Sequence, residues 1–91
     1  MELQQKILSE ILKSLRIEAG LDPDELSEAL QRDQGYIHRL EKGEEKVGLV
    51  DFHSICECMG KNSHEVFSMI CDRLADEMYV YHLNDKAQNS E

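Results

Sequence analysis

Three cysteines and two nearby histidines are the residues of this sequence with the most evident capacity for chemistry, because thiolates and imidazoles bind zinc. The cysteines are Cys56, Cys58 and Cys71, with His53 and His64 close to the first two. His53 and Cys56 are three residues apart and would share a helix face, so a metal site is conceivable, but a helix turns Cys58 away from Cys56. The cysteines are odd in number and lack the C-x-x-C spacing of zinc ribbons and redox motifs. We therefore expect reduced, mostly buried thiols, with no metal and no other cofactor.

A second candidate for chemistry is a basic cluster in the segment 32–46. Arg32, Arg39, Lys42 and Lys46 balance four acidic residues there, whereas the whole chain has 10 Lys and Arg against 19 Asp and Glu and a net charge of −9. A negative net charge opposes the binding of a polyanion. If any surface meets a nucleic acid, we expect this segment to form it.

The sequence carries no signature of catalysis. It has no phosphate-binding loop and no nucleophile motif, and its carboxylates are typical of solvated helix faces. The 91 residues are enough for one domain, which we place at residues 1–83. No apolar run approaches the roughly 18 residues that span a bilayer, and the first ten residues lack the features of a signal peptide. We expect a cytoplasmic protein that is not an enzyme.

Capping signals predict two helices at the start of the chain. Apolar residues recur at helical spacing over residues 2–19, and Gly20 suits the left-handed position that ends a helix. Asp22 is a good N-cap for the second helix, because Pro23 fits the first helical position and Glu25 completes a capping box. The second helix is short and is expected to end near residue 31.

A third helix is expected directly after a tight turn. Asp33 is a fresh N-cap candidate for a helix that starts at residue 34 and ends at Gly43. Ile37 and Leu40 should face the core, with Tyr36 at the boundary between core and solvent. The pattern is therefore helix, turn, helix.

Two further helices complete the predicted all-α domain. The fourth ends at Gly60 and is expected to bury Phe52, Ile55, Cys56 and Met59. Ser63 is expected to cap a long fifth helix over about residues 63–82, with an apolar stripe of Val66, Phe67, Ile70, Cys71, Leu74 and Met78. Residues 84–91 contain almost no apolar side chain and are expected to form a disordered tail.

The stretch from Leu15 to Phe67 resembles the Xre-type, or lambda-repressor-like, helix-turn-helix family of bacterial and phage transcriptional regulators. The matching positions are Arg16, Gly20, Leu21, Asp22, Glu25, Leu26, Ser27, Leu30, Ile37, Leu40, Glu41 and Gly43. The resemblance implies a five-helix lambda-repressor-like DNA-binding domain with a core at residues 15–67, here with extended first and fifth helices.

The resemblance also implies that the third helix enters the major groove of DNA. Gln34 could then pair bidentately with adenine, and Arg39 could read guanine or hold a phosphate. Without the family, both would be interpreted as ordinary solvated side chains. The full DNA-binding set that we infer is Gln34, Gly35, Tyr36, His38, Arg39, Arg32, Lys42 and Lys46, of which His38 and Lys42 are the weaker candidates.

Four features depart from the family pattern. Pro23 stands where many members carry a phosphate-clamping Gln, and it offers no amide N–H. Gly35 removes a side chain at a frequent base-reading position, and Glu44 with Glu45 occupies a loop that is often basic. Gln31 stands where Gly is usual, which requires a different turn or a left-handed residue.

The family pattern also pairs Arg16 with Glu41. A guanidinium binds a carboxylate bidentately in a partly dry site, which would fix the angle of the third helix. The alternative is two exposed charges of little energetic value.

The fifth helix is predicted to form a homodimer, because its apolar pattern continues well beyond Phe67. The predicted interface is Leu74, Met78, Tyr79, Tyr81 and Leu83. The alternative is that this helix packs along its length against its own core, with the first helix as partner.

The function predicted from these observations is sequence-specific DNA binding by a repressor-like transcriptional regulator, which binds a short palindromic operator as a homodimer in the bacterial cytoplasm. The competing hypothesis is an acidic protein-interaction module, such as an antitoxin-like or accessory partner protein, which keeps the fold but binds another protein.

Overall fold

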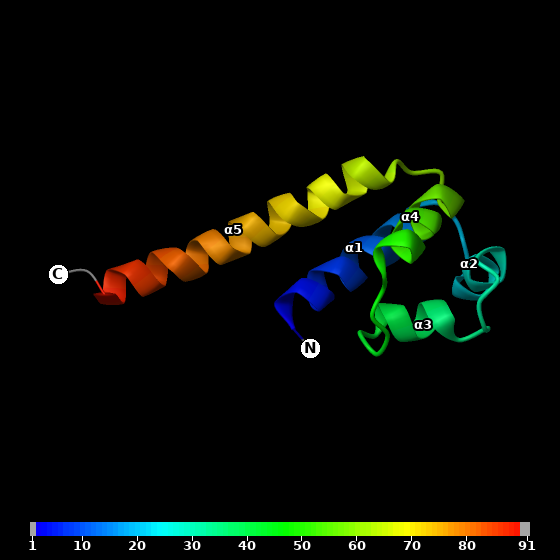
Figure 1. Cartoon of the computed structure of the whole chain (residues 1–91), viewed down its shortest axis with the longest axis horizontal. Coiled ribbons are helices and arrows are strands. Elements are labelled where there is room, and N and C mark those ends of the chain that lie inside the picture. Colours follow the sequence, from blue (N-terminus) through cyan, green and yellow to red (C-terminus); the bar gives the residue numbers. More distant parts are fainter. Residues whose placement is uncertain (1, 90–91) are drawn as a thin grey trace.

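The computed structural model describes the backbone of residues 2–89 and the side chains of residues 2–77. Within residues 2–89 all regular structure is helical, as expected for this fold class. The helices are α1 (Leu3–Glu18), α2 (Pro23–Ala29), α3 (Tyr36–Glu41), α4 (Leu49–Cys58) and α5 (Ser63–Asn89). Helices α1 to α4 gather at one end of the molecule, and α5 extends well beyond them (Figure 1).

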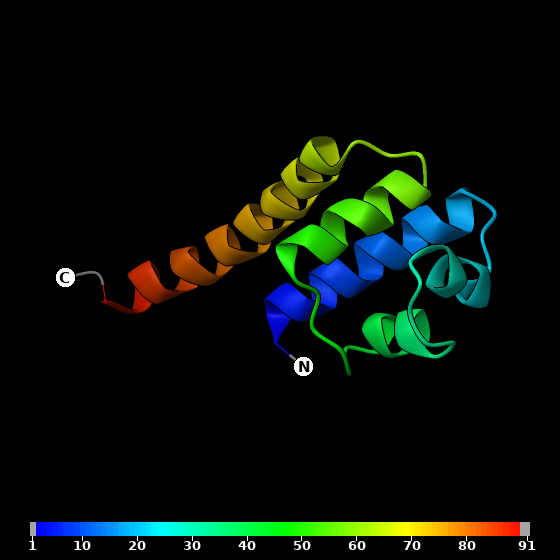
Figure 2. The same ribbon diagram turned by 45° about the vertical axis from the view of Figure 1, so that its right-hand side comes forward.

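Helix α1 lies in the middle of the bundle and is packed against both α3 and α5 (Figure 2). One continuous apolar core joins all five helices, and burial of this kind provides the main driving force for folding. Its buried members are Ile7, Ile11, Leu12, Leu15, Leu26, Tyr36, Ile37, Leu40, Phe52, Ile55, Cys56, Met59, Val66 and Ile70.

The start of α2 confirms the predicted capping box. The backbone N–H of Asp22 donates to Oε1 of Glu25 at 3.0 Å, and Pro23 occupies the first turn. Gly20 has a φ of +73°, the left-handed conformation expected where α1 ends. These local interactions set where the chain reverses between α1 and α2.

The turn between α2 and α3 differs in detail from the expectation. Gln31 has a φ of +58°, so it adopts the left-handed conformation that glycine usually provides at this position. Helix α3 begins at Tyr36 rather than at residue 34. Asp33 folds the intervening residues into a turn, because its carbonyl accepts the N–H of Tyr36 at 3.1 Å and its Oδ2 accepts the N–H of Gly35 at 3.2 Å.

Helix α5 begins at Ser63, as predicted, but its capping side chain and its end differ from the prediction. The side chain that caps it belongs to Asn62, whose Oδ1 accepts the N–H of Glu65 at 3.1 Å, whereas the Ser63 hydroxyl contacts His53 at 2.8 Å. The helix continues to Asn89, through residues that were expected to form a disordered tail. None of the helices in the described part of the chain combines the length and the apolar character needed to cross a membrane.

Candidate nucleic-acid interface

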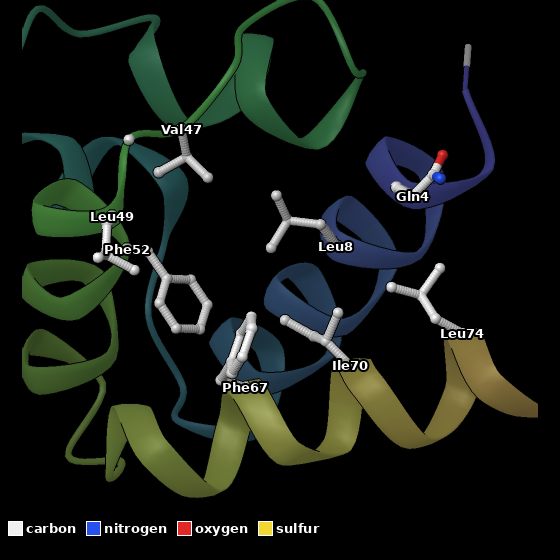
Figure 3. Close-up of a pocket in the computed structure, with 9 residues that line it drawn as sticks. Gln4, Leu8, Val47, Leu49, Phe52, Phe67, Ile70 and Leu74 are labelled. Carbon is white, nitrogen blue, oxygen red and sulfur yellow. The ribbon is translucent and has the colours of Figure 1, made fainter.

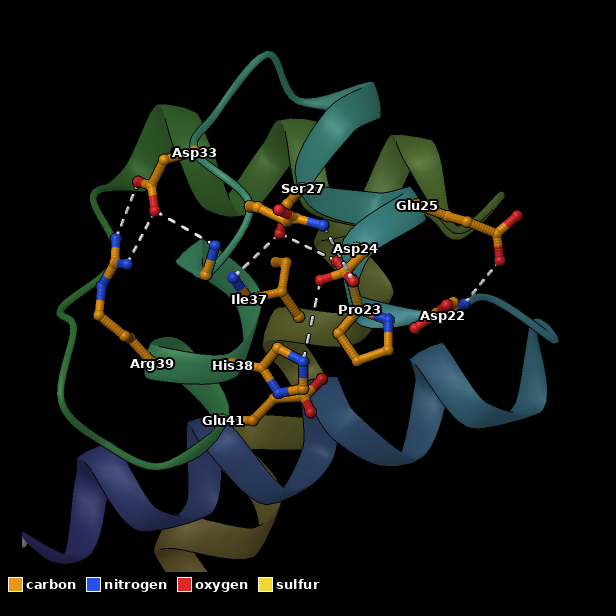
Figure 4. Close-up of polar contacts among 12 residues, drawn as sticks. Asp22, Pro23, Asp24, Glu25, Ser27, Asp33, Ile37, His38, Arg39 and Glu41 are labelled. Atoms are coloured by element: carbon orange, nitrogen blue, oxygen red, sulfur yellow. Dashed lines mark hydrogen bonds and ion pairs between the residues drawn. The ribbon is translucent and has the colours of Figure 1, made fainter.

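A buried serine joins α2 to α3. The Ser27 hydroxyl donates to the carbonyl of Pro23 at 2.9 Å and accepts the backbone N–H of Ile37 at 3.1 Å, and its side chain is fully buried (Figure 4). One of the N–H groups at the start of α3 is therefore satisfied by α2. Because Leu26 and Leu40 pack in the same core, α3 is held at a fixed orientation with its other face outward.

An ion pair joins the end of α3 to α1, at the two positions predicted from the sequence. Nε of Arg16 donates to Oε2 of Glu41 at 2.6 Å, and Nη2 donates to Oε1 at 3.1 Å. The side chains are only 10% and 9% exposed. Arg16 also donates from Nη1 to the carbonyl of Leu21 at 2.8 Å, so three of its donors are used. This bidentate geometry is the strong form of an arginine–carboxylate contact.

The outward face of the turn and of α3 carries polar side chains at helical spacing. Gln34, His38 and Lys42 are exposed, and Arg39 is half-buried beside them. Gln34 approaches Oδ2 of Asp24 at 3.5 Å, and His38 lies 3.9 Å from the same carboxyl group. These side chains of α3 and its flanking residues are the ones available for contact with another molecule.

Tyr36 lies in the core, which corrects the expectation that it sits at the boundary and contacts DNA. It is 2% exposed, and its hydroxyl has no hydrogen-bond partner among the described residues. The Arg32 guanidinium covers the ring at 4.8 Å, which is a cation–π contact. Burial raises the pKa of the Tyr36 hydroxyl above its usual value. Tyr36 therefore packs in the core beneath α3 and is not part of the exposed face.

The two arginines of the basic cluster are both paired with carboxylates. Arg39 donates from Nη1 and Nη2 to Asp33 at 2.8 and 2.9 Å, and from Nε to Glu45 at 2.9 Å. The hydrogen bonds from Arg39 lower the pKa of the Asp33 carboxyl to about 2, and the hydrogen bonds that Arg39 donates to both carboxylates raise the pKa of Arg39. Arg32 donates to Asp51 at 2.5 Å, which raises its pKa in the same way. The sequence did not reveal these pairings.

Lys42 and Lys46 complete the cluster and differ from the arginines. Both are exposed, and neither takes part in the ion pairs found among residues 2–77. Flexible ammonium groups of this kind bind phosphate as point charges. Lys42 and Lys46 are therefore the cations of the segment that DNA would meet without first breaking an internal contact.

The thiols show no site chemistry in the described residues. Cys56 is buried, which raises the pKa of its thiol to about 11, but Cys58 and Cys71 are exposed, so the expectation of mostly buried thiols is wrong. Helix geometry explains the difference for Cys58, which lies two positions from Cys56 and faces away from the core. The structure shows no metal-binding group of three or more side chains among residues 2–77.

An apolar groove of about 260 Å³ lies between α1, α4 and α5 (Figure 3). Phe52, Phe67, Ile70 and Leu74 line one part of it, and the rest is formed by Gln4, Leu8, Val47, Gly48 and Leu49. Phe67, which belongs to the apolar stripe predicted for the fifth helix, is 54% exposed. Beside the groove, Leu49 and Val50 are 81% and 77% exposed. This surface exposes more apolar side chain than is usual where a helix end faces only solvent.

The groove also bears on the residues predicted to form a dimer interface. Leu74 is half-buried against the core and also lines the groove. It is therefore compatible with both alternatives for the fifth helix, which are packing against its own core and contact with a second chain. The other predicted members are Met78, Tyr79, Tyr81 and Leu83, whose side chains lie outside the described residues. The sequence analysis missed Leu49 and Val50, although two adjacent apolar residues at the start of a helix could have indicated this surface.

The sequence profile of the helix-turn-helix domain matches residues 7–65. The chain belongs to this helix-turn-helix family. The match spans α1 to α4 and the start of α5, and it includes both partners of the Arg16–Glu41 pair. Among curated proteins, no relative matches the sequence.

Solved structures of similar fold include two of the clp gene regulator ClgR from Corynebacterium glutamicum. One is 26% identical with a TM-score of 0.74, over 99% of this chain and 96% of that one. The other is 28% identical with a TM-score of 0.69, over 78% and 91%. The chain is thus an Xre-type, DNA-binding transcription regulator by family and fold.

The restriction-modification controller protein C.Esp1396I has the same fold at lower identity. It is 18% identical with a TM-score of 0.73, over 81% of this chain and 97% of that one. Its tetramer in complex with its natural 35 base-pair operator gives a TM-score of 0.70 at 18% identity, over 79% and 95%. These neighbours are regulators rather than enzymes.

Proposed function

We propose that this helix-turn-helix regulator reads a short operator with α3, in the cytoplasm of a bacterium. The observation that carries the proposal is an exposed polar face on and beside α3, which the core, Ser27 and the Arg16–Glu41 pair hold in place. His38 lies on α3, Gln34 in the turn before it and Lys42 directly after it. A rigidly held helix with polar side chains at its N-terminal end is suited to the major groove. Operator binding by C.Esp1396I, a protein of the same fold, is consistent with this role.

Within this face the residues take different roles. Gln34 is the base reader, because a carboxamide matches the N6 and N7 edge of adenine. Lys42 and Lys46 hold phosphates, since both are exposed and lie outside the ion pairs of residues 2–77. Gly35 contributes only backbone, and His38 is a secondary contact.

The acidic surface limits phosphate binding to these few contacts. Each phosphate that a protein neutralises releases a counterion, so few contacts give a shallow dependence of affinity on salt. We expect weak binding to non-specific DNA and a small salt slope.

We further propose that a second copy of the chain covers the apolar groove. Leu49, Val50 and Phe67 are too exposed to be explained by the fold of one chain, and Leu74 connects this surface to the rest of α5. We expect a two-fold interface on α4 and α5 to fix the spacing between the two copies of α3. Half-sites about 34 Å apart, one DNA turn, are what a palindromic operator requires.

Two matched variants test the dimer. Leu49→Glu should shift the mass measured by light scattering from two chains to one, because a carboxylate in the apolar interface must be desolvated. Ile17→Glu is the control, since Ile17 is an exposed apolar residue of α1, 59% accessible, and does not line the groove. A single-chain mass for the unmodified protein at micromolar concentration would reject the dimer.

Substitutions on α3 test the DNA-binding surface. Gln34→Ala should weaken binding to the best operator by about 1 to 3 kcal/mol and relax base choice at one position, whereas Lys42→Ala should weaken all sequences alike. Lys13→Ala, an exposed lysine on α1, makes the same change of charge outside α3 and is the control. If a randomised DNA pool at low salt yields no enriched sequence, the protein-interaction module replaces this proposal.

A further inference from the structure

We propose that Asp33 and Glu45 form a clamp that holds Arg39 away from DNA, so that an operator must displace at least one carboxylate before Arg39 can contact a base or a phosphate. This inference rests on the proposed DNA-binding function. It assigns to Asp33 and Glu45 the role of setting how readily the surface accepts DNA.

The hydrogen bonds of Arg39 occupy the donors that recognition needs. An arginine reads guanine by aiming two parallel N–H groups at O6 and N7. The end of the guanidinium, Nη1 with Nη2, donates to both oxygens of Asp33 at 2.8 and 2.9 Å. The second edge of the guanidinium is formed by Nε and Nη2, and on this edge Nε donates to Glu45 at 2.9 Å. Each two-donor edge of the guanidinium is therefore wholly or partly used within the protein.

Gly35 provides the space in which the clamp lies. A Cβ at this position would stand 3.0 Å from Nη1 of Arg39 and 3.7 Å from Oδ2 of Asp33, and the first distance is tighter than ordinary packing. The same Oδ2 accepts the N–H of Gly35 at 3.2 Å, which holds Asp33 in position. The glycine that departs from the family pattern is thus the residue over which the Arg39 guanidinium lies.

The clamp stays charged under physiological conditions and is also weak enough to open. The pKa of Asp33 is about 2, so its carboxylate is ionised at neutral pH. The side chains of Arg39, Asp33 and Glu45 are 38%, 63% and 32% exposed. Ion pairs with this exposure change an equilibrium constant by about two- to five-fold each. The clamp therefore lowers the affinity for DNA moderately and leaves it reversible.

Removal of any carboxylate near DNA also weakens electrostatic repulsion, so the test needs a variant that changes only the charge. Glu44 meets this need, since it is the exposed neighbour of Glu45 and takes part in none of the ion pairs among residues 2–77. Glu44→Gln removes one charge and leaves the clamp intact. Asp33→Asn and Glu45→Gln remove one charge each and open it, while the side-chain amide oxygen that Asp33→Asn introduces can still accept the N–H of Gly35.

The experiment measures, by fluorescence anisotropy, the affinity of the full-length variants for the duplex enriched from a random DNA pool. Asp33→Asn and Glu45→Gln should each bind about two- to five-fold more tightly than Glu44→Gln. In an Arg39→Ala background this advantage should disappear, because no guanidinium remains to be released. Circular dichroism confirms that each variant is folded.

Two results would overturn the clamp, and they are distinguishable. If the duplex binds but all three carboxylate variants gain equally, or if the advantage persists without Arg39, the clamp is wrong and the DNA-binding function stands. If neither the unmodified chain nor Asp33→Asn enriches any sequence from the pool, the proposed function fails and the clamp's role fails with it.

Discussion

Loss of the Glu41 carboxylate should destabilise the fold more than any single change at an exposed charge. In Glu41→Ala the Arg16 guanidinium loses both charge-assisted hydrogen bonds and keeps only the one to the carbonyl of Leu21. Hydrogen bonds to charged groups contribute about 1.5 to 3 kcal/mol each, and breaking a buried ion pair costs about 3 to 5 kcal/mol. Because Arg16 is 10% exposed and can be partly hydrated, we expect a loss of about 3 kcal/mol.

Thermal unfolding followed by circular dichroism measures this loss. For a domain of this size, about 3 kcal/mol lowers Tm by roughly 12 to 24 °C. Glu18→Ala is the matched control, since Glu18 is 67% exposed and lies 3.5 Å from Lys61, and its loss should cost less than about 1 kcal/mol. Equal shifts of Tm in the two variants would show that the Arg16–Glu41 pair is energetically like a surface pair and would refute the reasoning.

Three further predictions follow from particular residues. An NMR titration should give the Asp33 carboxyl a pKa of about 2, and Arg39→Ala should return that pKa towards 3.8; an unchanged pKa would contradict the pairing. The contribution of Asp33 to stability is therefore present above pH 4 and is lost as the pH falls towards 2. Gln31→Gly should raise the free energy of unfolding in urea by up to about 1 kcal/mol, because glycine adopts the left-handed conformation without a Cβ penalty, and a loss of stability would argue against that conformation. A thiol reagent at neutral pH should modify the two exposed cysteines quickly and Cys56 only upon unfolding, and three equal rates would contradict the burial of Cys56.

Local chemistry explains which parts of the fold could be predicted from sequence. The capping box at Asp22 and Glu25 involves residues three apart, so its hydrogen bonds depend on local sequence alone. The left-handed conformation of Gln31 was one of two possibilities, and both came from the resemblance to a family in which Gly is usual at this position. The Arg16–Glu41 contact, 25 residues apart, was accessible only through the resemblance to a family.

The parts that sequence did not predict depend on tertiary packing. Tyr36 was expected at the boundary of the core, but the arrangement of α3 places its ring under Arg32 and buries its hydroxyl. The carboxylates that engage Arg39 come from the turn and from the loop after α3, and no periodicity brings them together. Phe67 is 54% exposed although it lies on the apolar stripe, because apolar spacing along α5 does not determine which of its positions neighbouring helices cover.

Selection from a randomised DNA pool tests the central claim most directly, because it requires α3 to recognise bases and the dimer to set their spacing. The unmodified chain should enrich an inverted repeat whose half-sites are about one helical turn apart, and Gln34→Ala should relax the same position in both halves. Failure to enrich any sequence at low salt, or enrichment that Gln34→Ala leaves unchanged, would contradict the account.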